Sequence, residues 1–294
     1  KQILEKGECY LEAAEIAQAL ERYAEAAELF RSAGNLERAA EALRSLGENE
    51  AAARILGEFH RDRGELKEAA SQMQEAGDFL EAGDMYRRLE SYSEAGACYR
   101  KQGDYAQAAE MLRMAGEREQ AAECFERAGR FTEAAECHAL VGHSGREAEL
   151  LDKAGNHLRA GEVYHREGMD EEAIKVLQKV APEASDFSKA SALLGELFRS
   201  RGQLSLAIKK LRQSLGESEL GRDNLPVYYR LATICGEGEQ IREAVEIYEK
   251  ILAFDYHYED VEQRLAQARQ RLAASPALSG VGDAAAESSA NTGS

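Results

Sequence analysis

The chain has 294 residues, 44% hydrophobic and 31% charged, a composition typical of folded globular proteins rather than collagenous or disordered ones. Only 3 Pro and no Trp, in a sequence rich in Ala, Glu, Leu and Arg, favour an all-α protein. The formal net charge of -17 opposes binding to polyphosphates and anionic lipids. No apolar run approaches the ~20 residues that cross a bilayer, and no signal segment opens the sequence. We therefore expect a cytoplasmic location, no nucleic-acid partner and no membrane insertion.

A repeat of 13 residues runs through most of the chain. The spacing between its starting positions is constant except between Gly47 and Gly64, where it is 17. Five residues after nearly every start stands Ala, with Glu147 as the exception, and the next position is also small in most units. The starting positions are Glu21, Gly34, Gly47, Gly64, Gly77, Glu90, Gly103, Gly116, Gly129, Gly142, Gly155 and Gly168.

Each unit predicts one short amphipathic helix, because its apolar positions follow the i, i+3, i+4, i+7 pattern. The glycine ends one helix in a left-handed conformation, and the polar residue after it is expected to cap the next helix at Asn35, Asp78, Asp104 and Asn156. About ten helical residues span only ~15 Å and are unstable alone. The repeat therefore predicts a solenoid of antiparallel helical hairpins, with two units in each hairpin.

Two departures from the period divide the chain. Four additional residues within 48–63 predict one longer helix. After Pro182 the hairpins become full-length, and residues 260–272 are expected to form a closing helix. Because the sequence begins with Lys1 rather than Met, we expect a piece of a longer or processed protein. The predicted organisation is a compact hairpin array over 1–181, two full-length hairpins and a closing helix over 182–272, and a flexible tail or linker over 273–294.

The pattern of a Gly, an aromatic residue two positions later, Ala at five, an aromatic residue at nine and Ala at twelve resembles the second helix of the tetratricopeptide repeat (TPR). The segments around Leu194-Gly195 and Leu231-Ala232 resemble whole repeats of this kind. The resemblance implies a right-handed α-solenoid whose first helices line a concave face. It implies nothing specific about function, because the repeat is a scaffold that unrelated proteins share.

Cysteine and histidine do not form a recognisable site in the sequence. Cys98, Cys124 and Cys137 stand where other units carry Leu, Ile or Met, so we expect buried free thiols. No Cys-x-x-Cys, phosphate-binding loop or nucleophile elbow is present. A cluster of four histidines is not expected to converge on a metal: His138, His143, His157 and His165. We therefore expect no metal, no cofactor and no enzymatic activity within this chain.

The remaining pattern is a row of carboxylates. If residues 78–89, 104–115, 130–141 and 156–167 are first helices, then the resemblance places one carboxylate of each helix, with arginines beside them, on the concave face. The simplest interpretation is a solvated helix face with Glu–Arg pairs. The alternative is an acid-led groove for a basic or amphipathic peptide or helix. The candidate residues are Asp84, Arg87, Arg88, Glu110, Arg113, Glu136, Glu162 and Arg166.

The function that we predict is a non-catalytic scaffold that binds a protein or peptide partner, as a module of a larger signalling or assembly protein. Two alternatives remain open. One is a self-assembling structural subunit, similar to the helical hairpin proteins of intraflagellar transport and vesicle coats. The other is a regulatory domain of an enzyme whose catalytic part lies outside this chain.

Overall fold

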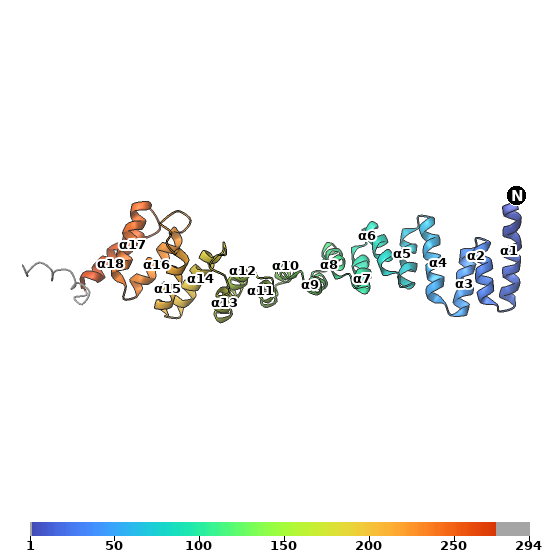
Figure 1. Ribbon diagram of the computed structural model, residues 1–294, viewed down its shortest axis with the longest axis horizontal. Helices are drawn as coiled ribbons and strands as arrows, with labels where there is room; N and C mark the ends of the chain where they lie inside the picture. The colour runs from blue at the N-terminus through green and yellow to red at the C-terminus, as the bar shows by residue number, and fades with distance from the viewer. Residues whose placement is uncertain (1, 275–294) are drawn as a thin grey trace, which may run out of the picture. The chain divides into compact units, whose positions relative to one another are not determined.

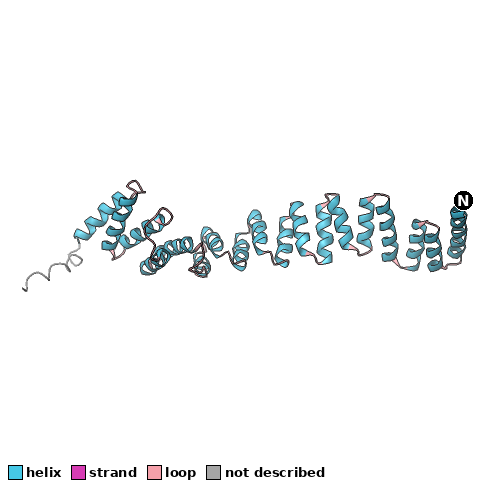
Figure 2. Ribbon diagram, turned by 45° about the horizontal axis from the view of Figure 1, so that its top comes forward, coloured by secondary structure: helices cyan, strands magenta, loops and turns pink. Residues whose placement is uncertain are grey.

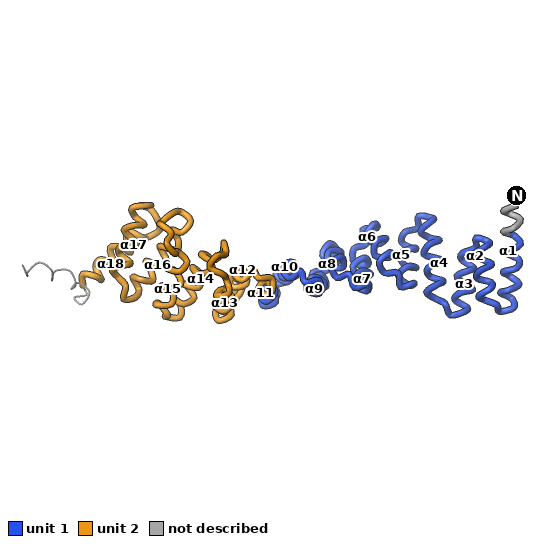
Figure 3. The backbone as a smooth tube through the Cα atoms, in the orientation of Figure 1, with its two compact units in different colours: residues 1–150 blue, residues 151–294 orange. Residues whose placement is uncertain are grey.

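The computed structural model describes the backbone of residues 2–274 and the side chains from residue 8 onward. Within that part the chain forms 18 helices and no strand (Figure 2). The all-α helical-repeat fold is therefore confirmed. The chain divides into two compact units, residues 1–150 and 151–294 (Figure 3), and each is described by itself. The predicted tail lies outside the described residues from 275 onward.

Unit 1 is a stack in which consecutive helices pack against each other from residue 2 to residue 141 (Figure 1). The predicted insertion is confirmed as a longer helix, α4. Helix α11 (Ser144–Lys153) crosses the division between the units. The helices are α1 (Gln2–Ala19), α2 (Tyr23–Ser32), α3 (Leu36–Leu46), α4 (Asn49–Asp62), α5 (Leu66–Glu75), α6 (Phe79–Arg88), α7 (Tyr92–Gln102), α8 (Tyr105–Met114), α9 (Arg118–Arg127) and α10 (Phe131–Val141).

Unit 2 contains the longer hairpins expected after Pro182. Alternate helices also meet: α12 contacts α14, α14 contacts α16 and α16 contacts α18. The last helix buries Val261, Leu265 and Ala268 and is the predicted closing helix. The helices are α12 (His157–Arg166), α13 (Asp170–Leu177), α14 (Phe187–Ser200), α15 (Leu204–Leu215), α16 (Leu225–Glu237), α17 (Ile241–Phe254) and α18 (Val261–Ala274).

The start of every 13-residue unit adopts the left-handed conformation. All ten glycines of the repeat have a positive φ. Glu21 and Glu90, which replace glycine at this position, also have a φ of 57°. The geometry of the turn is therefore set by the repeat, and it forces two glutamate residues into a left-handed backbone conformation that L-residues rarely adopt.

The predicted caps form at only half of the positions. The side chains of Asn35 and Asp104 accept hydrogen bonds from backbone amides three residues later, at 3.2 and 3.0 Å. The prediction was wrong for Asp78 and Asn156, which make no such bond. Asp78 instead accepts two hydrogen bonds from Arg54, at 2.7 and 2.9 Å. An ion pair between helices has displaced a local cap.

Close packing between neighbouring helices depends on one recurrent contact. A small residue of one helix receives the large side chain that stands 16 residues later, on the next helix. At Gly96, an added Cβ would lie 2.7 Å from Leu112 Cγ, closer than carbon atoms can approach. The same arrangement occurs for Gly57 with Met73, Gly83 with Tyr99, Gly161 with Leu177 and Gly195 with Leu211.

Replacing Glu90 with Gly is expected to stabilise the protein by about 0.5–1 kcal/mol, because the strain of a left-handed glutamate exceeds the entropy that glycine adds to the unfolded chain. Urea unfolding followed by circular dichroism measures the change. The matched control is Glu94→Gly, an exposed position inside α7. That variant is expected to lose about 1 kcal/mol, and equal effects of the two substitutions would contradict the assignment of the turn.

Gly96→Ala is expected to destabilise the protein by about 1–2 kcal/mol, because overpacking against the fully buried Leu112 outweighs the helix propensity of alanine. The measurement is again urea unfolding. Gly145→Ala is the control, since a Cβ there meets no atom within 4 Å, and it should be neutral or stabilising. Adding Leu112→Val to Gly96→Ala should recover part of the loss, and a further loss instead would argue against the close contact.

Candidate partner-binding surface

Three of the eight predicted residues, Glu110, Arg113 and Glu136, line one hollow between α8 and α10. Its volume is about 410 Å³. The carboxylates stand at the same position of their repeat units, so the register brings them to the same side of alternate helices. We call this site the α8–α10 hollow, and its lining residues are Glu110, Arg113, Gly116, Arg118, Arg130, Glu133, Glu136, Cys137 and Leu140.

The charges in the α8–α10 hollow are largely paired with one another. Glu110 accepts a hydrogen bond from Arg113 Nη2 at 2.7 Å, and Arg130 Nη1 lies 2.8 Å from its other carboxylate oxygen. Arg130 also pairs with Glu133 at 2.7 Å. The lining therefore has three carboxylates and three arginines, so this hollow is balanced in charge rather than led by acid.

Two charged side chains of the α8–α10 hollow are available to a partner. Glu136 and Arg118 are exposed, and neither forms an ion pair with any described residue. Leu140, one turn after Glu136, is 69% exposed, and Met114, at the same unit position of α8, is 54% exposed. Cys137 is buried beside them, and burial raises the pKa of its thiol, which keeps this wall of the hollow uncharged. The surface combines apolar side chains with one free carboxylate and one free guanidinium.

The other predicted residues do not line this hollow. Asp84 accepts hydrogen bonds from the Tyr99 hydroxyl at 2.7 Å and from Arg87 at 3.0 Å. Burial and the neighbouring Asp84 raise the pKa of Tyr99. Arg88 is exposed at the end of α6. Glu162 and Arg166 belong to α12 of unit 2, where both are exposed.

A second hollow of about 440 Å³, which was not predicted from the sequence, lies between α2 and α4. Glu28 and Arg54 stand at the same position of their repeat units as Glu110 and Glu136. The spacing of the repeat could therefore have identified them from the sequence. We call this site the α2–α4 hollow. Its lining residues are Ala24, Ala27, Glu28, Arg31, Leu43, Leu46, Glu48, Ala51, Arg54, Ile55 and Glu58.

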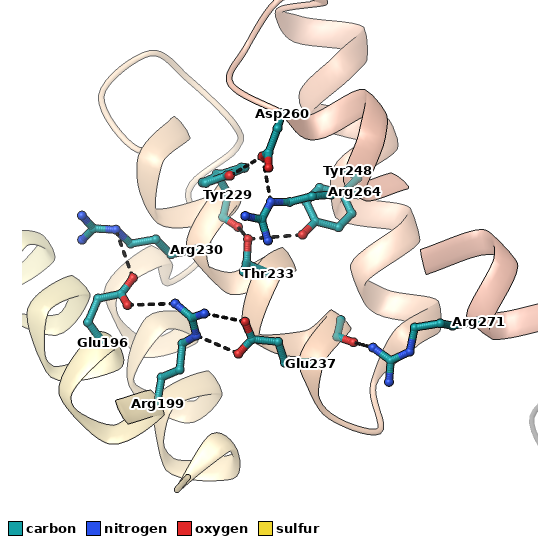
Figure 4. A network of polar contacts seen from close by, with 11 residues as sticks. Glu196, Arg199, Tyr229, Arg230, Thr233, Glu237, Tyr248, Asp260, Arg264 and Arg271 are labelled. Atoms are coloured by element: carbon teal, nitrogen blue, oxygen red, sulfur yellow. Dashed lines mark hydrogen bonds and ion pairs between the residues drawn. The ribbon is translucent and has the colours of Figure 1, made fainter. Parts of the chain in front are cut away.

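A polar network joins α14, α16, α17 and α18 in unit 2 (Figure 4). Arg199 makes a bidentate ion pair with Glu237, in which Nε and Nη2 donate to the two carboxylate oxygens at 2.7 and 2.5 Å. Asp260 accepts hydrogen bonds from the Tyr229 hydroxyl at 2.5 Å and from Arg264 at 2.7 Å. Burial, followed by the bond to Asp260, raises the pKa of Tyr229 to about 12. These groups satisfy one another, so the network fixes the closing helix rather than offering charges to a ligand.

The buried cysteines are free thiols, and two of the histidines lie beside aspartates. Cys98, Cys124 and Cys137 are buried free thiols, as predicted. His157 Nδ1 lies 2.9 Å from Asp152, and His165 Nδ1 lies 2.8 Å from Asp170. Among the described residues, no group of three or more His, Cys, Asp or Glu side chains is arranged to hold a metal ion. In the same part of the chain, no helix is both long enough and apolar enough to cross a membrane.

Two family models match parts of the sequence. The family described as soluble NSF attachment protein, SNAP, matches residues 1–117, and the tetratricopeptide repeat matches residues 225–257. No curated protein matches the chain. Both matches are to helical-repeat families, so they agree with the helices of the two units.

Solved structures similar to this chain include MamA, YrrB and Naa15/Naa10. MamA shows 20% identity and a TM-score of 0.37, covering 52% of this chain and 84% of its own. YrrB, described as a TPR protein with an unusual peptide-binding site, shows 13% identity and a TM-score of 0.37, covering 65% of this chain and 90% of its own. Naa15/Naa10 bound to HypK-THB shows 17% identity and a TM-score of 0.39, covering 90% of this chain and 39% of that one.

The pKa of the Glu110 carboxyl is expected to lie below the ordinary value of about 4.3, because Arg113 and then Arg130 donate hydrogen bonds to its charged form. This carboxylate therefore stabilises the folded state above the ordinary pKa, and the contribution is lost as the pH falls through the lowered value. A carboxyl NMR titration measures the pKa. Arg113→Gln should raise it towards the ordinary value, and an unchanged titration in that variant would contradict the pairing.

Proposed function

Because the chain is a tetratricopeptide-like helical-repeat protein, we propose that it is a non-catalytic scaffold that holds a segment of a protein partner in the α8–α10 hollow. The supporting observation is the adjacency of exposed Leu140 and unpaired Glu136 at the edge of that hollow. An exposed aliphatic side chain gains free energy when a partner covers it, and the neighbouring carboxylate accepts a hydrogen bond from a basic side chain. The segment that fits is amphipathic, with an apolar residue next to Lys or Arg.

The paired charges of the hollow support specificity. Arg130 is held by both Glu110 and Glu133, so its side chain is already ordered before a partner arrives. A preorganised surface loses less conformational entropy when it binds. The paired groups therefore shape the hollow, while Glu136, Arg118 and Leu140 provide the contacts.

The matched families support the class of function and not the identity of the partner. The family that matches the first 117 residues is described as an attachment protein, and the repeat that matches residues 225–257 is a scaffold shared by unrelated proteins. From these families we carry over to this chain only the expectation that its partner is a protein or a peptide. The basic or amphipathic character of the partner is inferred from Glu136 and Leu140 at the edge of the α8–α10 hollow.

The test is selection of a displayed peptide library on the full chain. Enriched peptides are expected to carry an aliphatic residue beside Lys or Arg, and their binding to the Glu136→Arg, Leu140→Ser double variant should fall about tenfold or more, because the carboxylate becomes a like charge and the apolar contact is lost. Fluorescence anisotropy of a labelled selected peptide measures the affinity.

The control is the Glu123→Arg, Leu206→Ser variant, which changes an exposed carboxylate and an exposed leucine outside both hollows. It should bind as the unmodified chain does. Equal binding by all three proteins would overturn the proposed site. Light scattering provides a separate check on the scaffold function, since a mass that rises with concentration and no enriched peptide would instead favour self-assembly.

A further inference from the structure

We propose that the α2–α4 hollow is a second docking site, which receives a long aliphatic side chain flanked by Lys or Arg on a segment of another protein. This site uses residues separate from those of the α8–α10 hollow, so the two proposals can fail independently. Two features support it: the apolar floor of the hollow and the free charges at its rim.

The floor of the α2–α4 hollow is apolar. Ile55 and Ala27 are buried at its base, while Leu43 is half-buried and Leu46 is 44% exposed. Small side chains, Ala24 of α2 and Ala51 of α4, stand among the lining residues and leave room between the two helices. The volume of about 440 Å³ lies within the roughly 300–1,000 Å³ range of ligand pockets. The hollow can therefore accept a Leu, Ile or Met side chain.

The rim of the α2–α4 hollow carries unpaired carboxylates. Glu28, Glu48 and Glu58 are exposed, and none of them forms an ion pair with a described residue. Of the two arginines in the lining, Arg54 is occupied by its two hydrogen bonds to Asp78. Three free carboxylates thus face one free guanidinium, that of Arg31. This excess of negative charge favours a basic partner.

The two hollows differ in how many of their carboxylates are already paired with arginines. In the α8–α10 hollow, Glu110 and Glu133 are neutralised by Arg113 and Arg130, so only one of the three lining carboxylates, Glu136, is left for an incoming Lys. In the α2–α4 hollow, an incoming Lys meets three exposed carboxylates that form no ion pair with a described residue. The latter hollow should therefore depend more strongly on basic flanking residues and on salt concentration.

The test uses the full chain and a fluorescein-labelled amphipathic helical peptide, about four helical turns long, with a leucine stripe flanked by lysines. The comparison peptide has each lysine replaced by glutamine. The lysine peptide is expected to bind about tenfold more tightly than the glutamine peptide at low salt, and the difference should shrink at high salt. Methyl NMR signals of Leu43, Leu46 and Ile55 should shift on binding.

The protein variants locate the effect. Removing the three rim charges by Glu28→Gln, Glu48→Gln and Glu58→Gln should abolish the preference for lysine over glutamine while leaving the circular dichroism unchanged. A matched variant removes three exposed carboxylates outside both hollows, Glu12→Gln, Glu75→Gln and Glu123→Gln, and should keep the preference. Leu46→Asp should weaken both peptides, because it places a charge on the apolar floor.

The proposal is overturned if the rim variant shows the same preference for the lysine peptide as its matched control does. It is also overturned if Leu46→Asp leaves the binding of both peptides unchanged. Loss of lysine-peptide binding in the Glu136→Arg, Leu140→Ser variant, with the rim variant unaffected, would place the peptide in the α8–α10 hollow. That result would reject the second docking site while supporting the proposed function. Retained binding in that double variant and lost preference in the rim variant is the expected outcome.

Discussion

The contact between a small residue and the large side chain 16 positions later is the interaction on which the other features of the structure depend. Helices of about ten residues are unstable in isolation, so each must gain its stability from its neighbours. Gly96 and Leu112 show how this is done, since the absence of a Cβ lets the leucine pack directly on the neighbouring backbone. The left-handed turn at every unit start then returns the chain so that the same contact can form again.

This regular packing also determines where hollows and ion pairs form. Because each helix of unit 1 packs mainly on its sequence neighbours, alternate helices meet through long side chains. Arg54 spans α4 to Asp78 before α6, and Arg130 reaches Glu110 of α8. Where such a bridge lies inside a hollow, as between Arg130 and Glu110, the two charges offset each other. Where the facing residues are small, as at Ala24 and Ala51, a hollow remains.

The repeat could be predicted from sequence because its signals are local. A glycine, an alanine pair and an apolar stripe specify the turn, the close approach and the buried face, which is why even Glu21 and Glu90 were correctly placed at turns. The ion pairs could not be predicted in the same way. Asp78 was expected to cap α6, yet its partner is Arg54, 24 residues away, and that choice depends on how two helices stack. Glu28 was missed although it shares the unit position of Glu110.

The acidity of the chain therefore has two physical roles that composition cannot separate. Carboxylates such as Glu110 and Asp260 are held by arginines, have lowered pKa values and stabilise the stack. Carboxylates such as Glu28 and Glu136 stand at equivalent repeat positions but form no ion pair within the described part of the chain, so their charges remain available to another molecule. A row of acidic residues on a helical repeat therefore indicates a binding surface only through those carboxylates that are not already in ion pairs. In this chain such carboxylates lie beside exposed aliphatic side chains.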